Sequence, residues 1–263
     1  MSISDRDLAI NAAEAGAAVV RAHYGTSVVR FAKSAGDFAT TADVEAEEAI
    51  LAVLRAARPD DPVLAEESGR TGTGGSERLW LVDPLCGTLN FAVRTMLVSV
   101  NVALRVGTRV VVAASADPFA QETFWTDGVE AGVRSAGVDQ RLVPSAESRL
   151  VDVNLDPPFP NRSVFRTARL LAHERFGERF RPRVVSTTLA VAWVAAGRRA
   201  AYVTDGQLRD NVHFAAGIAL CEAAGCVVTG IDGRPWRSSV GGLVAAADAR
   251  THADLLALIA EQG

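Results

Sequence analysis

The residues between Asp83 and Thr88 bring several groups that could do chemistry into one short stretch. This run reads Asp83-Pro-Leu-Cys86-Gly87-Thr88 and joins an apolar strand, expected over 79–83, to the start of a predicted helix. A helix N-terminus favours negative charge, and cysteines there show thiol pKa values lowered from about 8.5 to about 3.5–7.5. The sequence therefore predicts an activated thiolate at Cys86, three residues after a carboxylate.

The elements that must position these groups follow from hydrophobic spacing and from turn residues. Apolar residues at helical spacing, together with Gly and Pro stops, predict helices over 4–24, 43–57, 163–176, 188–196 and 215–224. Short β-branched runs predict strands over 62–66, 79–83, 96–106, 110–116, 184–186 and 200–203. Helices that alternate with strands, some of them grouped, indicate an α/β fold built from layers.

A Pro/Asp/Asn-rich stretch over 154–161 lies between the two halves of the chain. We predict an N-terminal α+β lobe over 1–145, which carries most of the candidate site. A C-terminal α/β lobe over 146–263 is expected to pack against it as one compact unit. A chain of 263 residues is long enough to bury the core that this arrangement needs.

Composition limits the classes of partner and the compartment. The net charge is −4, which gives no basic surface for nucleic acid. No apolar run approaches the ~18 residues of a membrane span, and the charged N-terminus lacks a signal-peptide core. We therefore expect a cytoplasmic protein with reduced thiols and without nucleic-acid or membrane partners. A homodimer is left open.

Four segments together resemble the inositol monophosphatase-like superfamily. Residues 80–91, Trp-Leu-Val-Asp-Pro-Leu-Cys-Gly-Thr-Leu-Asn-Phe, resemble its signature W-x-V-D-P-I-D-G-T-x-N-F. Residues 33–43 resemble its early K-x-x-x-D-x-V-T-x-x-D segment, 66–68 its E-E-S element, and 186–197 its helix ending in V-A-A-G. The resemblance covers nearly the whole chain and implies the α-β-α-β-α sandwich, with an active site between the lobes.

The resemblance also implies residue roles. In that family the positions of Glu66, Asp83 and the Leu85 carbonyl would hold one Mg²⁺ ion, with Glu67 in support. Asp83 and the residues at positions 86 and 213 would hold a second ion. Hard carboxylates suit Mg²⁺.

The same resemblance assigns the remaining groups. Asp43 and Thr88 would orient the attacking water, and the amides of Gly87 and Thr88 would receive a phosphate oxygen.

The chain departs from the family at two positions that share one metal ion. Both are aspartates in the family, but here they are Cys86 and His213. Further departures are Val185, Ala190 and Val212. Because thiolate and imidazole are poor Mg²⁺ ligands, the departures favour another chemistry. With Cys86 as nucleophile, His213 as base and Asp83 as orienter, the set has the logic of a catalytic triad. Asp117 and Asp210 are alternative orienters.

This hypothesis assigns acyl or thioester chemistry to the chain. The amides of Gly87 and Thr88 would form an oxyanion hole. The set resembles, in residue types only, thiol-dependent Dieckmann-type cyclases and acyltransferases of natural-product assembly lines. The substrate would be a small-molecule or carrier-protein-bound acyl group, and no cofactor would be required.

Three alternatives remain open. One is a metal-dependent phosphomonoesterase acting on an inositol or sugar phosphate, with Mg²⁺ at the residual ligands Glu66, Asp83 and Leu85. Another is a zinc-type site made of Cys86, His213 and Asp83. The third is a non-catalytic regulatory homologue. We expect the other histidines, His23, His173 and His252, to be surface or packing residues without partners.

Overall fold

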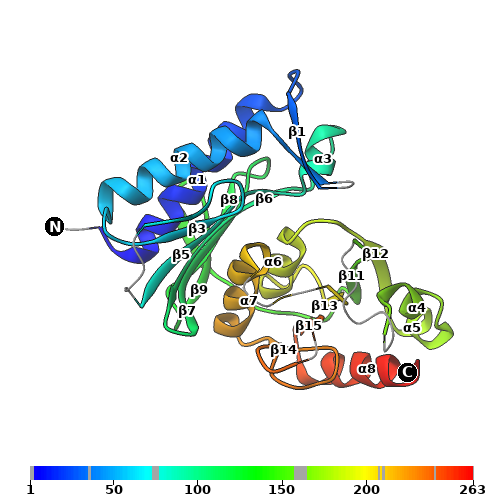
Figure 1. Ribbon diagram of the computed structural model, residues 1–263. Helices are drawn as coiled ribbons and strands as arrows, with labels where there is room; N and C mark the ends of the chain where they lie inside the picture. The colour runs from blue at the N-terminus through cyan, green and yellow to red at the C-terminus, as the bar shows by residue number, and fades with distance from the viewer. Residues whose placement is uncertain are drawn as a thin grey trace.

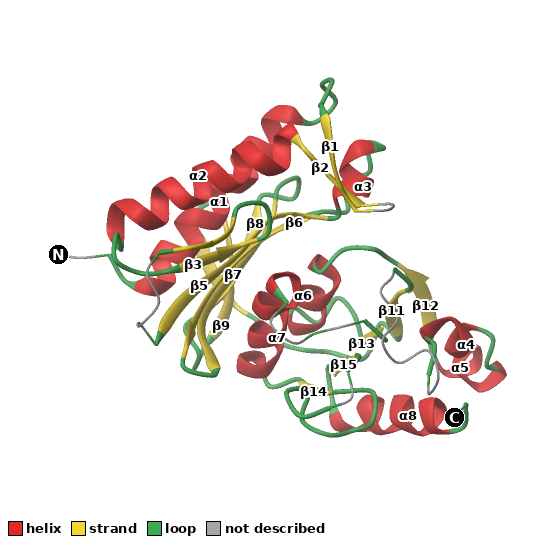
Figure 2. Cartoon of the chain, in the orientation of Figure 1, coloured by secondary structure: helices red, strands yellow, loops and turns green. Residues whose placement is uncertain are grey.

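A computed structural model describes residues 3–34, 37–72, 77–156, 165–206, 208, 211–239 and 241–262. Two sheets and the helices around them form five layers, in the order helix, sheet, helix, sheet, helix (Figures 1 and 2). The predicted α-β-α-β-α sandwich is therefore confirmed.

The first two layers belong to the N-terminal part of the chain. Helices α1 (Asp5–His23) and α2 (Thr41–Ala57) pack on one face of an eight-stranded sheet. Its strands run in the order β10-β9-β8-β7-β6-β5-β3-β4. Their bounds are β3 Val63–Ala65, β4 Gly69–Thr71, β5 Arg78–Cys86, β6 Ser99–Val106, β7 Arg109–Asp117, β8 Glu122–Thr126, β9 Ala131–Ser135 and β10 Val138–Arg141. A hairpin of β1 (Arg30–Ser34) and β2 (Asp37–Thr40) precedes α2.

The last three layers belong to the C-terminal part. Helices α6 (Leu189–Ala195) and α7 (Val212–Ala224) lie between the sheets, with α7 packed on β5, β6 and β7 and α6 on β13 and β15. The second sheet has the order β12-β11-β13-β15-β14. Its strands are β11 Leu150–Asn154, β12 Arg181–Val184, β13 Ala201–Thr204, β14 Val227–Thr229 and β15 Leu243–Ala246. Helices α4 (Thr167–Leu171), α5 (Glu174–Arg179) and α8 (Ala249–Ala260) cover its outer face.

Strand β5 is buried on both faces, and its alternating side chains decide which layer each residue meets. Trp80 and Val82 belong to the core beneath α1 and α2, whereas Leu79 and Leu81 belong to a cluster with α7. Asp83 continues the second set, since side chains two residues apart share a face of a strand. The sequence of β5 thus directs Asp83 toward the interface between the first sheet and α7.

Three predicted elements differ from the structure. The expected helix over 163–176 is two short helices, α4 and α5, because His173 is extended between them; residues 163 and 164 lie outside the described part. The strand expected over 184–186 ends at Val184, which is an exposed residue of the edge strand β12. The helix expected from 215 begins at Val212, because the Asn211 side chain accepts a hydrogen bond from the His213 amide and caps it.

The two sheets fall on either side of residue 145, but the division into lobes 1–145 and 146–263 stays a prediction. None of the helices in the described ranges combines the length and the apolar character needed to cross a lipid bilayer.

Candidate functional site

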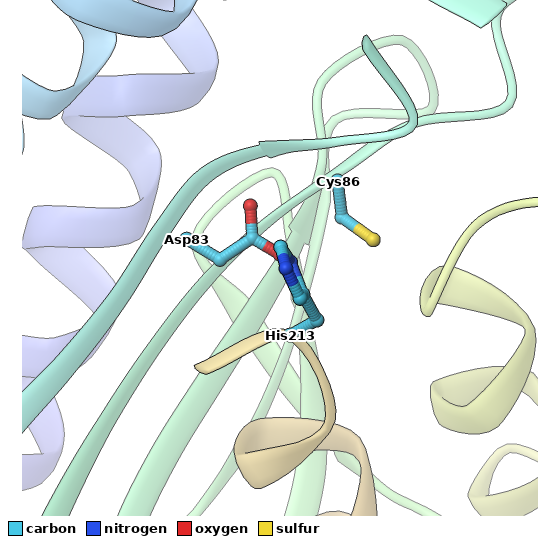
Figure 3. Close-up of side chains that lie close together, drawn as sticks. All are labelled: Asp83, Cys86 and His213. Atoms are coloured by element: carbon cyan, nitrogen blue, oxygen red, sulfur yellow. The ribbon is translucent and has the colours of Figure 1, made fainter. Parts of the chain in front are cut away.

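A β-bulge in β5 places Cys86 on the same side as Asp83. Asp83 pairs with Asn101 and Cys86 pairs with Ser99, so one extra residue of β5 lies between the two pairs. Strict alternation would put Asp83 and Cys86 on opposite faces. The bulge reverses the parity, so that Leu85 joins the core under α1 and α2 and Cys86 turns toward the helical layer. Figure 3 shows both side chains on that side of the strand.

The first turn of α7 adds His213 to this pair. Its Nδ1 lies 2.8 Å from Oδ2 of Asp83. One ligand atom from each of Asp83, Cys86 and His213 lies within 4.8 Å of the other two. In Figure 3 the imidazole ring faces Asp83 while the sulfur of Cys86 points away from both. That sulfur accepts a hydrogen bond, 3.3 Å long, from the Thr188 amide at the start of α6.

The turn after β3 brings two glutamates to the same region. The amides of Glu67 and Ser68 donate to the carboxylate of Glu47 on α2, at 2.8 Å each, which fixes the turn. Lys33 Nζ bridges Glu66 Oε1 at 2.7 Å and Glu67 Oε1 at 2.6 Å. Oε2 of Glu66 lies 3.8 Å from Nδ1 of His213, so Glu66 belongs to the site, and Glu67 reaches it through Lys33.

Asp43 and Thr88 form a separate pair beside these residues. The Thr88 hydroxyl lies 2.9 Å from Oδ1 of Asp43 and 3.2 Å from the Leu85 carbonyl. Oδ2 of Asp43 accepts the Thr40 amide, at 2.8 Å, at the start of α2. Because a helix start fixes one oxygen of Asp43, the other is aimed at Thr88.

Gly87 separates the strand from α3 (Thr88–Ala92), a single short turn of helix. Its φ is +106°, and a Cβ there would lie 2.8 Å from the Leu97 carbonyl. Only glycine fits that conformation and that space. The roles predicted for the Gly87 and Thr88 amides stay predictions.

A buried polar network lies beneath Asp83 and was not among the predicted site residues. The Asn101 amide nitrogen lies 3.3 Å from Asp83 Oδ2, 3.2 Å from Ser99 Oγ and 3.0 Å from Thr188 Oγ1, three acceptors that share its two hydrogens. Ser115 donates to the Asn101 carbonyl oxygen at 2.7 Å. The signal was available, because Ser99 and Asn101 alternate with valines in the run 98–102, Val-Ser-Val-Asn-Val. Polar residues at one parity of such a strand mark a polar patch within the core.

Other predicted residues lie elsewhere or have partners of their own. Asp117 accepts the amides of Phe119 and Ala120 in a turn, so it does not orient His213, and Asp210 lies outside the described residues. The expectation that the other histidines lack partners is wrong. They contact Glu45, Glu261 and Thr229, in the pairs His23–Glu45, His173–Glu261 and His252–Thr229.

The electrostatics of the cluster differ from those of an activated thiol. Burial, and then the charge of Asp83, raise the pKa of the Cys86 thiol above its ordinary value. Burial opposes the charge of His213, but its contact with Asp83 outweighs burial and raises the imidazole pKa well above 6.5. The site therefore favours a thiol beside an imidazolium, and an imidazolium cannot accept the thiol proton. The predicted lowering of the Cys86 pKa is wrong, because burial and then the charge of Asp83 exceed the effect of the short helix.

The donor atoms suit a hard cation at one of the two predicted metal positions but not at the other. Burial, and then the charge of Asp83, raise the pKa of Glu66 to about 8, although His213 and Lys33 act in the opposite direction. Glu66 Oε2 and Asp83 Oδ1 are buried and lack hydrogen-bond partners among the described residues. Carboxylate oxygens of this kind suit Mg²⁺, and the Leu85 carbonyl stays the predicted third donor. The neighbouring position offers sulfur and nitrogen from Cys86 and His213, which do not suit it.

Known proteins resemble this chain along most of its length. Residues 4–263 match the sequence profile of the inositol monophosphatase family. An inositol-1-monophosphatase of Caulobacter vibrioides is 32% identical over 213 residues, which are 76% of this chain and 78% of that protein. The Nus factor SuhB of Escherichia coli is 30% identical over 235 residues, 86% and 85% of the two chains.

Solved structures agree with these relatives. An inositol monophosphatase from Anabaena superposes with a TM-score of 0.78 at 25% identity, covering 97% of this chain and 95% of that one. The extragenic suppressor protein suhB from Bartonella henselae superposes with a TM-score of 0.84 at 24% identity, covering 96% and 97%.

These relatives overturn the prediction of a cysteine-dependent acyltransferase or cyclase. The family is named for a phosphatase, and the protonation of Cys86 and His213 opposes the thiolate that acyl transfer requires. The predicted proximity of Asp83, Cys86 and His213 is confirmed, but the acyl chemistry assigned to them is wrong. From residue 4 to residue 263, the chain belongs to the inositol monophosphatase family.

Proposed function

We propose that this protein hydrolyses a phosphate monoester with water as the nucleophile. The observation that carries the proposal is the hydrogen bond between Thr88 and Asp43, together with one oxygen each of Glu66 and Asp83 that accepts no hydrogen bond from the described residues. Thr88 and Asp43 can relay a proton from water, whereas Glu66 and Asp83 can hold a cation against a phosphate. The names of the relatives make an inositol monophosphate the first substrate to test.

Thr88 and Asp43 supply the proton relay. The Thr88 hydroxyl donates to Asp43, so its lone pairs can accept a proton from a bound water. As the water oxygen forms its bond to phosphorus, its proton passes to Thr88 and the Thr88 proton passes to Asp43. The phosphorus–oxygen bond of the ester breaks, and the leaving alkoxide takes a proton from solvent.

Glu66, Asp83 and the Leu85 carbonyl are the groups that would hold magnesium. Magnesium bound there would supply positive charge beside the phosphate. The chain's own contribution is to fix these oxygens. Lys33 holds one oxygen of Glu66, and Asn101 and His213 hold one oxygen of Asp83.

The test is phosphate release from inositol 1-phosphate and from p-nitrophenyl phosphate, with Mg²⁺ and with other divalent ions in parallel. Thr88→Val should lower kcat by about 100- to 10,000-fold, the usual contribution of a positioned proton-transfer group. Thr123→Val, which alters a buried threonine on β8 outside the site, is the matched control.

Two results would overturn the proposal. One is a Thr88→Val rate equal to that of the unmodified protein. The other is the absence of hydrolysis with every ion tested, which would leave the non-catalytic alternative standing.

A further inference from the structure

We propose that Asp83, Cys86 and His213 form a binding site for a borderline-soft transition-metal ion of the zinc class, in place of the second magnesium ion. For its catalytic consequence the inference rests on the phosphatase activity proposed above, whereas the binding itself does not. The donor set is one carboxylate oxygen, one sulfur and one imidazole nitrogen, from residues 83, 86 and 213.

The donor types select the ion. Thiolate and imidazole are preferred by Zn²⁺ and its neighbours, while Mg²⁺ demands oxygen donors and octahedral geometry. Catalytic zinc sites use three protein ligands and leave the fourth position for water. The side chain of His213 is 37% exposed and that of Asp83 is fully buried, so the cluster has one closed side and one side open to solvent. Three ligands and one open position match that pattern.

The spacing lies close to what such an ion requires. The three donor atoms lie within 4.8 Å of one another. Bond lengths of about 2.0–2.3 Å in a tetrahedral site place ligand atoms roughly 3.3–3.7 Å apart. The Cys86 sulfur, which now points toward α6, must therefore turn inward by at most about 1 Å. A side-chain rotation suffices, because the bulge already places its Cβ on the correct face.

Two of the donors have outer contacts, of which the one to Cys86 lengthens when its sulfur turns inward. The Thr188 amide donates to the Cys86 sulfur, and Asn101 donates to Asp83. Such second contacts orient ligands and tune their basicity in metal sites. Oδ1 of fully buried Asp83 has no hydrogen-bond partner among the described residues, so Asp83 keeps an oxygen that a cation on this side could share with the neighbouring position. On binding, the proton shared by His213 and Asp83 and the thiol proton of Cys86 leave to solvent.

The test uses Co²⁺ as a spectroscopic probe of the intact, chelator-treated protein. One equivalent should produce a sulfur-to-cobalt charge-transfer absorption in the near ultraviolet, and one equivalent of Zn²⁺ should remove it. A hundredfold excess of Mg²⁺ should leave it unchanged.

The variants assign the ligands. Cys86→Ser should abolish the charge-transfer band, while Cys226→Ser, at a cysteine outside the site, should keep it. His213→Gln should weaken Zn²⁺ binding by more than the roughly 10–100-fold that loss of an outer contact costs. His252→Gln is its matched control, and circular dichroism of each variant verifies folding. The double variant Cys86→Asp/His213→Asp should lose the band and bind Mg²⁺ at least tenfold more tightly than the unmodified protein.

The outcomes separate this inference from the proposed function. A band that is absent, or that survives Cys86→Ser, overturns the transition-metal site even if Mg²⁺-dependent hydrolysis is found. If the band is lost in Cys86→Ser and kept in Cys226→Ser while no ion supports hydrolysis, the transition-metal site stands and the proposed phosphatase activity is overturned.

Discussion

Replacing Asn101 with leucine tests whether the buried network under Asp83 stabilises the fold as well as the site. Asn101 is 1% exposed and takes part in four hydrogen bonds. Leucine has nearly the same size and removes all four. The groups left behind are Asp83, Ser99, Ser115 and Thr188, all of them buried.

The expected cost follows from what each group retains. Asp83 keeps its hydrogen bond to His213, and Ser99 and Thr188 keep the hydrogen bond between their hydroxyls at 3.4 Å. Each of the three bonds lost from these residues to Asn101 therefore costs about 1 kcal/mol. Ser115 is fully buried and its bond to Asn101 has no replacement, which costs about 1–3 kcal/mol. The added apolar surface of leucine returns about 1–2 kcal/mol. We expect a net loss of about 3 kcal/mol in the free energy of unfolding.

Urea denaturation in the presence of a chelator measures this loss without a contribution from bound metal. Asn11→Leu, at an exposed position of α1, is the control and should stay within about 0.5 kcal/mol of the unmodified protein. Ser115→Ala should fall between the two variants, because it removes one bond of the four. A loss below about 0.5 kcal/mol for Asn101→Leu would refute the reasoning, since it would mean that the network is not sealed from water.

Three further outcomes are expected. After chelation, Cys86 should react with iodoacetamide at neutral pH no faster than Cys226, because burial and a neighbouring carboxylate raise the pKa of the Cys86 thiol. Mass spectrometry of the labelled peptides measures both rates. Preferential labelling of Cys86 would contradict a protonated Cys86 thiol. Arg199→Met should cost about 3–5 kcal/mol in urea denaturation, because fully buried Asp152 loses the guanidinium 2.7 Å away. The loss should shrink as pH falls, because a protonated Asp152 buries no unpaired charge, and a pH-independent loss would argue against the ion pair. Gly197→Ala should lower stability by more than about 1 kcal/mol in the same assay, because φ is +71° and its Cβ would lie 2.5 Å from a carbonyl; unchanged stability would show that the loop can shift.

The spacing of apolar residues correctly predicted the helices and strands in which that spacing is regular. The helices near 5–23 and 41–57 and the strands within 78–117 agree with the structure to within a few residues. The spacing failed where a single residue decides where a helix begins or ends. The start of α7 depends on Asn211 as a cap, and the break between α4 and α5 depends on the extended backbone of His173. A search for caps would have found the first of these, whereas the second has no comparable signal in the sequence.

The family resemblance predicted which side chains meet, but not their protonation. Asp83, Cys86 and His213 do lie together, as three ligands of one metal position should. Residue types suggested a thiolate and a neutral base. Burial and the charge of Asp83 favour the opposite forms. Such a balance depends on the distances between charges and on the depth of burial, which spacing along a chain does not contain.

The bulge in β5 explains why this site could accept a thiol at all. Residues 83 and 86 differ by an odd number, so a regular strand would point one of them into the core beneath α1 and α2. Pro84 lacks an amide hydrogen and lies where the ladder between β5 and β6 is interrupted, which is where proline is tolerated in a sheet. The extra residue gives Cys86 the face of Asp83, and Gly87 then turns the chain away in a conformation that other residues resist. The backbone therefore presents position 86 to the cluster whatever side chain it carries. An exchange of aspartate for cysteine changes the ion that the position prefers and leaves the scaffold around it intact.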